Sequence, residues 1–155
     1  MMSTFIVIIA RCLLVLLFLP FSALDKLLNF NQAVAQASQA VALPWLAKVL
    51  IGVGCLVEVV MSTAILTGIA DRLAACILAI YCIVTAIVWK PFWKAPDFRF
   101  RGNSGGRDVF WDFLKNLALA GGFFLLAFGT NAPGVQRFLN HPLSSSHPYA
   151  DFHQE

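Results

Sequence analysis

The sequence predicts an all-α membrane protein: a bundle of four transmembrane helices, with an amphipathic helix at the membrane interface between spans one and two. Of the 155 residues, 59% are hydrophobic and 12% are charged, about half the charged share of an ordinary soluble domain. The mean hydropathy is +0.78. Apolar runs at residues 4–23, 44–67, 73–89 and 109–128 are long enough to cross a hydrocarbon layer of about 30 Å. Residues 1–128 therefore form one membrane domain, and residues 129–155 form a polar C-terminal tail.

The first span contains a basic residue, Arg11, and a proline, Pro20, which we expect to kink the helix. After it, apolar residues recur at the 3-4-3-4 spacing of an amphipathic helix over residues 25–42, at Leu27, Phe30, Val34, Ala37 and Val41. This pattern is typical of a helix that lies in the membrane interface. Pro44 suits the first turn of the next helix.

The second span carries one carboxylate, Glu58, well inside an apolar run. A charge at that depth is costly in lipid, so it is expected to be paired, neutral or facing a polar cavity. Counted at about 1.5 Å per residue, Arg11 and Glu58 both lie about 10 Å from the same membrane side. We therefore expect a buried Arg11–Glu58 ion pair inside the bundle. Two alternatives stay open: the pair only orients the helices, or Arg11 extends to the interface.

The third span follows a short link, residues 68–72, and presents Tyr81, Thr85 and Trp89 on one face. Packing or an interfacial aromatic belt explains that stripe. The loop at residues 90–107 is the clearly polar connection, with five basic residues, Lys90, Lys94, Arg99, Arg101 and Arg107. Basic loops favour the cytoplasmic side, so both termini are expected on the other side.

The fourth span opens with polar residues one or two turns inside its N-terminal end. Asp112 lies where the helix dipole favours an acid, and Lys115 and Asn116 lie about 10–12 Å in from the loop side. The sequence predicts a polar pocket near the loop. Its candidate lining is Lys26, Trp111, Asp112, Lys115 and Asn116. The alternative is that Asp112 simply neutralises Lys115.

Several classes of function receive no support from composition. The net charge of +3 forms no basic stripe of the kind that binds nucleic acid. The four cysteines lie in apolar runs without a CxxC pair, which disfavours a thiol oxidoreductase. His141, His147 and His153 are evenly spaced in the tail, but without carboxylate or cysteine partners they favour a flexible tail over a metal site. We expect no metal.

The ordered features resemble the DoxX family of small four-helix bacterial membrane proteins over residues 5–128. They are an early arginine and a closing lysine in IARCLLVLLFLPFSALDKLL, a proline before span two, a glutamate ten residues before a glycine in EVVMSTAILTG, an alanine-rich third span, and FWDFLKNLALAGG in span four. The family often has a glycine before that lysine, where this chain has residues 22–25, SALD. This departure concerns local packing.

The resemblance implies a redox-associated protein of the bacterial inner membrane, because some DoxX-like proteins are membrane subunits of thiosulfate:quinone oxidoreductases and others belong to envelope redox or thiol-stress systems. As an enzyme, the chain would be at most an accessory subunit. A quinone is the possible cofactor, with donors from Arg11, Lys26, Trp111, Lys115 and Asn116. A redox partner would dock at the 90–107 loop. The alternatives are a small proton-coupled transporter that uses Glu58 and a purely structural assembly subunit.

Overall fold

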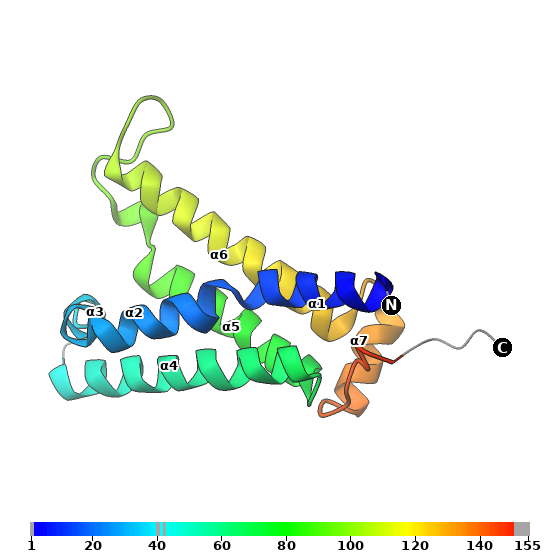
Figure 1. The fold of residues 1–155 in the computed structure, drawn as a ribbon. Helices are drawn as coiled ribbons and strands as arrows, with labels where there is room; N and C mark the ends of the chain where they lie inside the picture. Colours follow the sequence, from blue (N-terminus) through cyan, green and yellow to red (C-terminus); the bar gives the residue numbers. More distant parts are fainter. Residues whose placement is uncertain (1, 40, 42, 151–155) are drawn as a thin grey trace.

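A computed structural model describes residues 2–39, 41 and 43–150. Within these residues the chain is all-helical, which confirms the predicted class, and four helices are long and apolar enough to cross a membrane. In chain order the elements are α1 (Met2–Val15), η1 (Leu17–Ser22), α2 (Ala23–Leu28), α3 (Phe30–Ala37), α4 (Pro44–Thr67), α5 (Asp71–Trp89), η2 (Phe92–Lys94), α6 (Gly105–Phe128) and α7 (Ala132–Asn140) (Figure 1).

The first span is a broken helix made of α1, η1 and α2, and it extends from Met2 to Leu28. The break is at Leu19, whose φ of −122° and ψ of 113° are extended rather than helical. It lies beside Pro20, because proline has no N–H to donate and its ring displaces the preceding turn. The predicted kink is therefore present. The helix expected over residues 25–42 is shorter, since α2 belongs to the first span and α3, which packs on α4, covers only Phe30–Ala37.

The long helices are arranged as two pairs that diverge from a common core. The first span packs antiparallel to α4, and α5 packs mainly along α6. Figure 1 shows α5 and α6 leaning away from α2 and α3, so that the two pairs separate at one end. At the other end lie the N-terminus, the α4–α5 turn and α7. We call these the loop end and the strap end.

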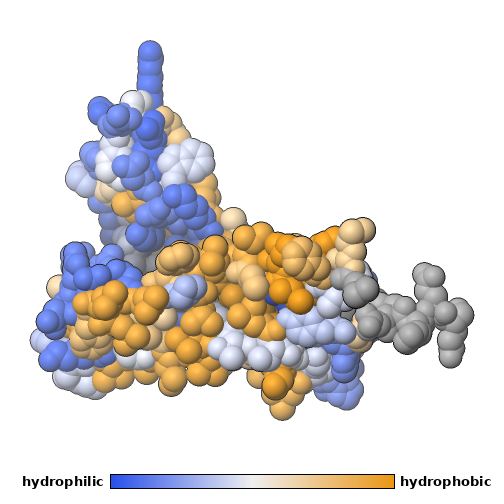
Figure 2. All heavy atoms as spheres, in the orientation of Figure 1, coloured by the Kyte–Doolittle hydropathy of each residue, from blue (hydrophilic) through white to orange (hydrophobic). Residues whose placement is uncertain are grey.

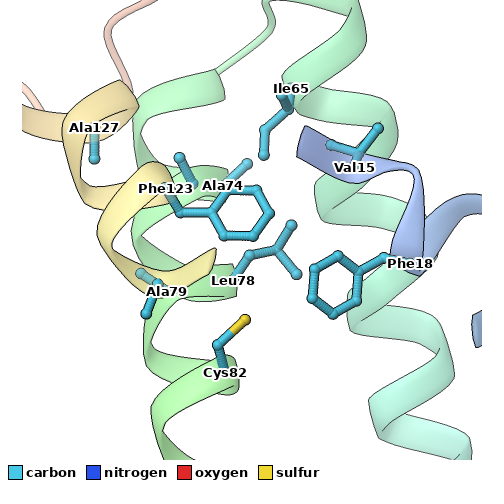
Figure 3. Packing of buried hydrophobic residues seen from close by; sticks show 11 residues of the cluster. Val15, Phe18, Ile65, Ala74, Leu78, Ala79, Cys82, Phe123 and Ala127 are labelled. Carbon is cyan, nitrogen blue, oxygen red and sulfur yellow. The ribbon is translucent and has the colours of Figure 1, made fainter. Parts of the chain in front are cut away.

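The shared core occupies the strap half of the bundle. Small residues of α5, such as Ala75 and Ala79, let α5 approach its neighbours closely, and Leu78 and Phe123 fill the space between them. Figure 3 shows these side chains with Val15, Phe18 and Ile65 pointing into one cluster. From α4 the cluster takes only residues from Val57 onward. The bundle is therefore tightly packed at one end and divided at the other.

Loop-end residues form a folded unit, which we call the arm (residues 90–115). Its aromatic rings pack edge to face or tilted, with centroids within about 6 Å, at Phe92, Trp93, Phe98, Phe100, Phe110 and Phe113. Asp97 accepts hydrogen bonds from the N–H groups of Gly105 and Gly106, at 2.7 and 3.1 Å, and so caps α6. Figure 2 shows the arm as a mostly hydrophilic projection beside an apolar body.

Residues 129–150, which belong to the polar C-terminal tail of the sequence, contain the helix α7 and contact the bundle. Asn131 caps α7 by accepting a hydrogen bond from Gly134 N–H at 2.9 Å. Phe138 of α7 is buried against Phe128 of α6, with ring centroids 5.0 Å apart. The chain then returns to the α4–α5 turn. His153 lies outside the described residues.

Candidate functional site

A buried carboxylate, Glu58, lies at the point where the two helix pairs begin to separate. Its residue is 1% exposed. Its Oε1 atom accepts hydrogen bonds from Lys26 Nζ of α2, from Tyr81 Oη of α5 at 2.9 Å and from Ser22 Oγ at 3.2 Å. Lys26 also donates to Ser22 Oγ at 2.8 Å. We call Ser22, Lys26, Glu58 and Tyr81 the Glu58 cluster.

The local sequence explains how these groups meet. Gly54 lies one turn before Glu58, and a side-chain carbon built there would be 3.0 Å from Tyr81 Oη, so the glycine makes room for the phenol. Phe18 packs against the Tyr81 ring, with centroids 6.2 Å apart. The helix break in η1 directly precedes Ser22 and Lys26. The cluster thus joins the first span, α4 and α5.

Two polar atoms near this cluster stand out. All three donors converge on one oxygen of Glu58, and the other, Oε2, accepts no hydrogen bond from any residue that the structure describes. Ser62 Oγ, one turn further along α4, is buried and likewise has no partner among the described residues. Buried polar atoms in proteins are normally hydrogen-bonded to protein or water. The cluster can therefore take one more donor.

Arg11 does not pair with Glu58, and the expectation of an Arg11–Glu58 ion pair is wrong. The Arg11 guanidinium donates to Asp71 Oδ2 at 2.7 Å, to Ser146 Oγ at 2.6 Å and to the carbonyl of Ile65. Ile65 lies seven residues beyond Glu58, which is about 10 Å along α4. The expectation that Arg11 and Glu58 lie at equal depth assumed that the first span and α4 end at the same level. In the structure α1 extends beyond the end of α4. The counter-ion of Glu58 is Lys26.

The second buried ion pair, Arg11–Asp71, includes a residue from the C-terminal segment. Asp71 is fully buried and Arg11 is 5% exposed. Ser146 donates its backbone N–H to Asp71 Oδ1 at 2.8 Å and its hydroxyl to Asp71 Oδ2 at 2.5 Å. Sequence reasoning missed both Asp71 and Ser146. An acid in the first turn of a helix is ordinary, and a serine in a polar tail carries no signal.

The pocket predicted around the start of span four is not formed as a set. Lys26 belongs to the Glu58 cluster. Asp112 instead binds Lys90 at 3.1 Å and Lys115 at 3.3 Å, while Asn116 donates to the Asp112 backbone carbonyl at 3.1 Å. The Lys115 side chain is 73% exposed, and Trp111 also faces outward. Asp112 thus pairs with Lys115, as in the local alternative, and also with Lys90.

The arm holds the whole net charge of the chain. Residues 90–115 contain six basic residues and three acidic ones, a balance of +3, which equals the total of +3. The remaining residues carry five basic and five acidic groups. Because the rest is balanced, electrostatic attraction of a charged partner is concentrated here.

Comparison with known proteins gives two findings. A model of the DoxX family matches residues 6–91, a segment that includes Arg11, Lys26, Glu58 and Asp71 but neither Ser146 nor most of the arm. The chain is also similar to the inner membrane protein YphA of Escherichia coli K12, with 29% identity over 131 residues that cover 84% of this chain and 85% of YphA. No solved structure matches significantly.

Proposed function

Because this chain belongs to the DoxX family and is a multi-pass protein of the bacterial inner membrane, we propose that it is a redox-associated subunit whose Glu58 cluster holds the headgroup of a quinone. One observation carries the proposal. Three donors from separate helical segments bind one oxygen of the buried Glu58 carboxylate, and its second oxygen has no partner among the described residues. The chain's role in catalysis would be accessory.

The chemistry of the cluster suits both forms of a quinone. An oxidised quinone has two carbonyl oxygens that accept hydrogen bonds, and Lys26 and Tyr81 are donors. A quinol has hydroxyl groups that donate, and Glu58 Oε2 is an acceptor. One cluster can therefore bind either form by redistributing the same hydrogen bonds.

We infer that a headgroup would approach this cluster from the loop end, toward which α5 and α6 diverge from α2 and α4 (Figure 1). The Lys26 side chain is 17% exposed, while that of Glu58 is 2% exposed. A headgroup would thus meet Lys26 first and Glu58 behind it, with its apolar tail left among lipid-facing side chains.

Binding of a short-tailed quinone to the protein in lipid nanodiscs tests the proposal. Tyr81→Phe and Lys26→Met should each weaken binding by about tenfold or more, because a hydrogen bond involving a charged group contributes roughly 1.5–3 kcal/mol. Lys48→Met is the matched control, since Lys48 is an exposed lysine of α4. Quinone binding that is absent, or equal in all four proteins, would reject the quinone site.

The arm is the surface at which we propose that an acidic redox partner docks. Its exposed basic residues include Lys94, Arg99 and Arg101, and long-range attraction to an acidic surface raises association rates. Co-purification from native membranes tests this. Arg99→Ser with Arg101→Ser should lose a partner that the unchanged protein retains, and the loss should be reproduced by high salt.

A second candidate function, proton-coupled transport, draws on the helix break. Small transporters commonly place a binding site beside a discontinuous helix in mid-membrane, and η1 lies next to Glu58. An infrared carboxyl band that titrates near neutral pH and is missing in Glu58→Gln would favour this function.

The third candidate is a purely structural assembly subunit. It would be favoured if a protein with both Glu58→Gln and Lys26→Met assembled fully and lost no function.

A further inference from the structure

The C-terminal strap, which we define as residues 144–149, covers the Arg11–Asp71 ion pair at the strap end. Ser146 binds both members of the pair. Tyr149 Oη donates to the carbonyl of Leu66 at the end of α4. Pro148 lies so close to Gly68 that a side-chain carbon on the glycine would be 2.9 Å from the proline ring. Asp71, in the first turn of α5 at the end of the bundle, is therefore fully buried.

Polar groups continue inward from this covered pair along one face of α4. The carbonyl of Ile65 accepts from Arg11. Ser62 comes next, then Glu58, at steps of three and four residues, or about 4.5 and 6 Å. Ser62 Oγ and Glu58 Oε2 are the two buried atoms of this face that find no partner in the described part of the chain. Buried polar atoms of this kind are typically served by single water molecules.

We propose that these groups form a proton route that runs from the aqueous phase at the strap end to Glu58 and leaves through its hydrogen-bonded partner Lys26, whose side chain is 17% exposed, and that the strap is its lid. The charged and titratable groups along it are Asp71 and Arg11 at the outer end and Glu58, Lys26 and Tyr81 at the inner end. The apolar core cluster, which includes Val15, Phe18 and Leu78 (Figure 3), packs against this part of α4. These apolar walls leave Ser62 0% exposed, which suits protons carried by single waters and excludes larger solutes.

The lid explains why a buried ion pair lies at the end of the bundle. Without the strap, Asp71 would lose two donors and Arg11 one acceptor, and bulk water would replace them. The route then opens on the side opposite the arm. It concerns the same carboxylate as the proposed quinone site, but it requires no quinone.

Proton flux into liposomes that contain the purified full-length protein tests the route. A pH-sensitive dye is enclosed, a potassium gradient with valinomycin drives protons inward, and no quinone is present. The unchanged protein should give the flux of empty liposomes. Ser146→Pro removes both the N–H and the hydroxyl that bind Asp71, and it should raise the flux several-fold. Ser144→Ala is the control, because the Ser144 hydroxyl has no partner among residues 2–39, 41 and 43–150.

The path itself is tested in the Ser146→Pro protein. Adding Ser62→Ala should return the flux to that of empty liposomes, whereas adding Thr63→Ala, on the neighbouring exposed face, should leave it raised. If Ser146→Pro does not fold, Ser146→Ala, which removes only the hydroxyl, replaces it in both experiments. The proposal is overturned if a folded strap variant shows no increase in proton flux, or if the increased flux persists after Ser62→Ala is added. Neither outcome bears on quinone binding, which is measured separately.

Discussion

Replacing Asp71 by asparagine should destabilise the protein strongly, because it leaves the Arg11 charge buried without its counter-ion. Asp71 is fully buried and Arg11 is 5% exposed. Breaking such a pair by neutralising one partner costs about 3–5 kcal/mol. For a chain of this length each 1 kcal/mol lowers the melting temperature by roughly 2–4 °C, so Asp71→Asn should melt roughly 6–20 °C below the unchanged protein.

Thermal unfolding in detergent, followed by tryptophan fluorescence, measures this difference. The matched control is Asp25→Asn, since the Asp25 side chain is exposed and its hydrogen bond is to Asn29 at 2.8 Å. A surface change of that kind stays within about 0.5 kcal/mol. Equal melting of the two variants would show that Asp71 is not held in a buried ion pair.

A double-mutant cycle identifies the partner of Asp71. Arg11→Met should recover part of the stability lost in Asp71→Asn, because the uncompensated charge disappears, with a coupling of about 0.5–3 kcal/mol. The same Arg11→Met in a Glu58→Gln background should be additive within about 0.5 kcal/mol, since Glu58 is bound to Lys26. If Arg11→Met were instead coupled to Glu58→Gln and not to Asp71→Asn, Arg11 would pair with Glu58. That result would refute the observed alignment of the first span with α4.

Three further substitutions test the Glu58 cluster and the arm. Tyr81→Phe removes one of the three donors to Glu58 and should lower the melting temperature by an amount equivalent to about 1.5–3 kcal/mol; an unchanged melt would place the phenol elsewhere. Gly54→Ala should displace the Tyr81 hydroxyl, which lies 3.0 Å from the added carbon, and weaken quinone binding, while Gly52→Ala, with nothing within 4 Å, should bind normally. Gly106→Ala places a carbon 2.8 Å from arm backbone and should lower the melting temperature, whereas Gly121→Ala, in open space, should not; equal melts would show that the arm is not packed on α6.

The class of fold is readable from the sequence because its signals are local. An apolar run of sufficient length must form a helix in lipid, where each backbone group needs an internal partner. The kink at Pro20 follows from the chemistry of one residue. These predictions needed no information on how the helices align with one another.

The pairing of the buried charges was not predictable, because it depends on the axial offset of two helices. Met2 lies nine residues before Arg11, while Thr67 lies two residues after Ile65, the residue level with Arg11. The first span thus projects seven residues, or about 10 Å, further. That offset moves Arg11 away from Glu58, and Lys26, in α2 at the end of the first span, binds Glu58 through its side chain instead.

The C-terminal contacts show a second limit of sequence reasoning. Ser146 and Asp71 are 75 residues apart, and no periodicity links them. A signal for α7 was present: Asn131 at an N-cap, Pro133 in the first turn, and Val135 with Phe138 on one apolar side. Such a short helix was hidden by its polar composition.

Because the net positive charge of the chain lies in the arm, the membrane potential acts on the arm more than on the rest of the chain when the protein inserts into the membrane. An interior-negative membrane potential opposes export of positive charge by about 2.3 kcal/mol per elementary charge for each 100 mV. Carrying the arm's balance of +3 outward would therefore cost about 7 kcal/mol at 100 mV. We therefore propose that the arm lies in the cytoplasm and that the strap end, with Ser146, faces the periplasm.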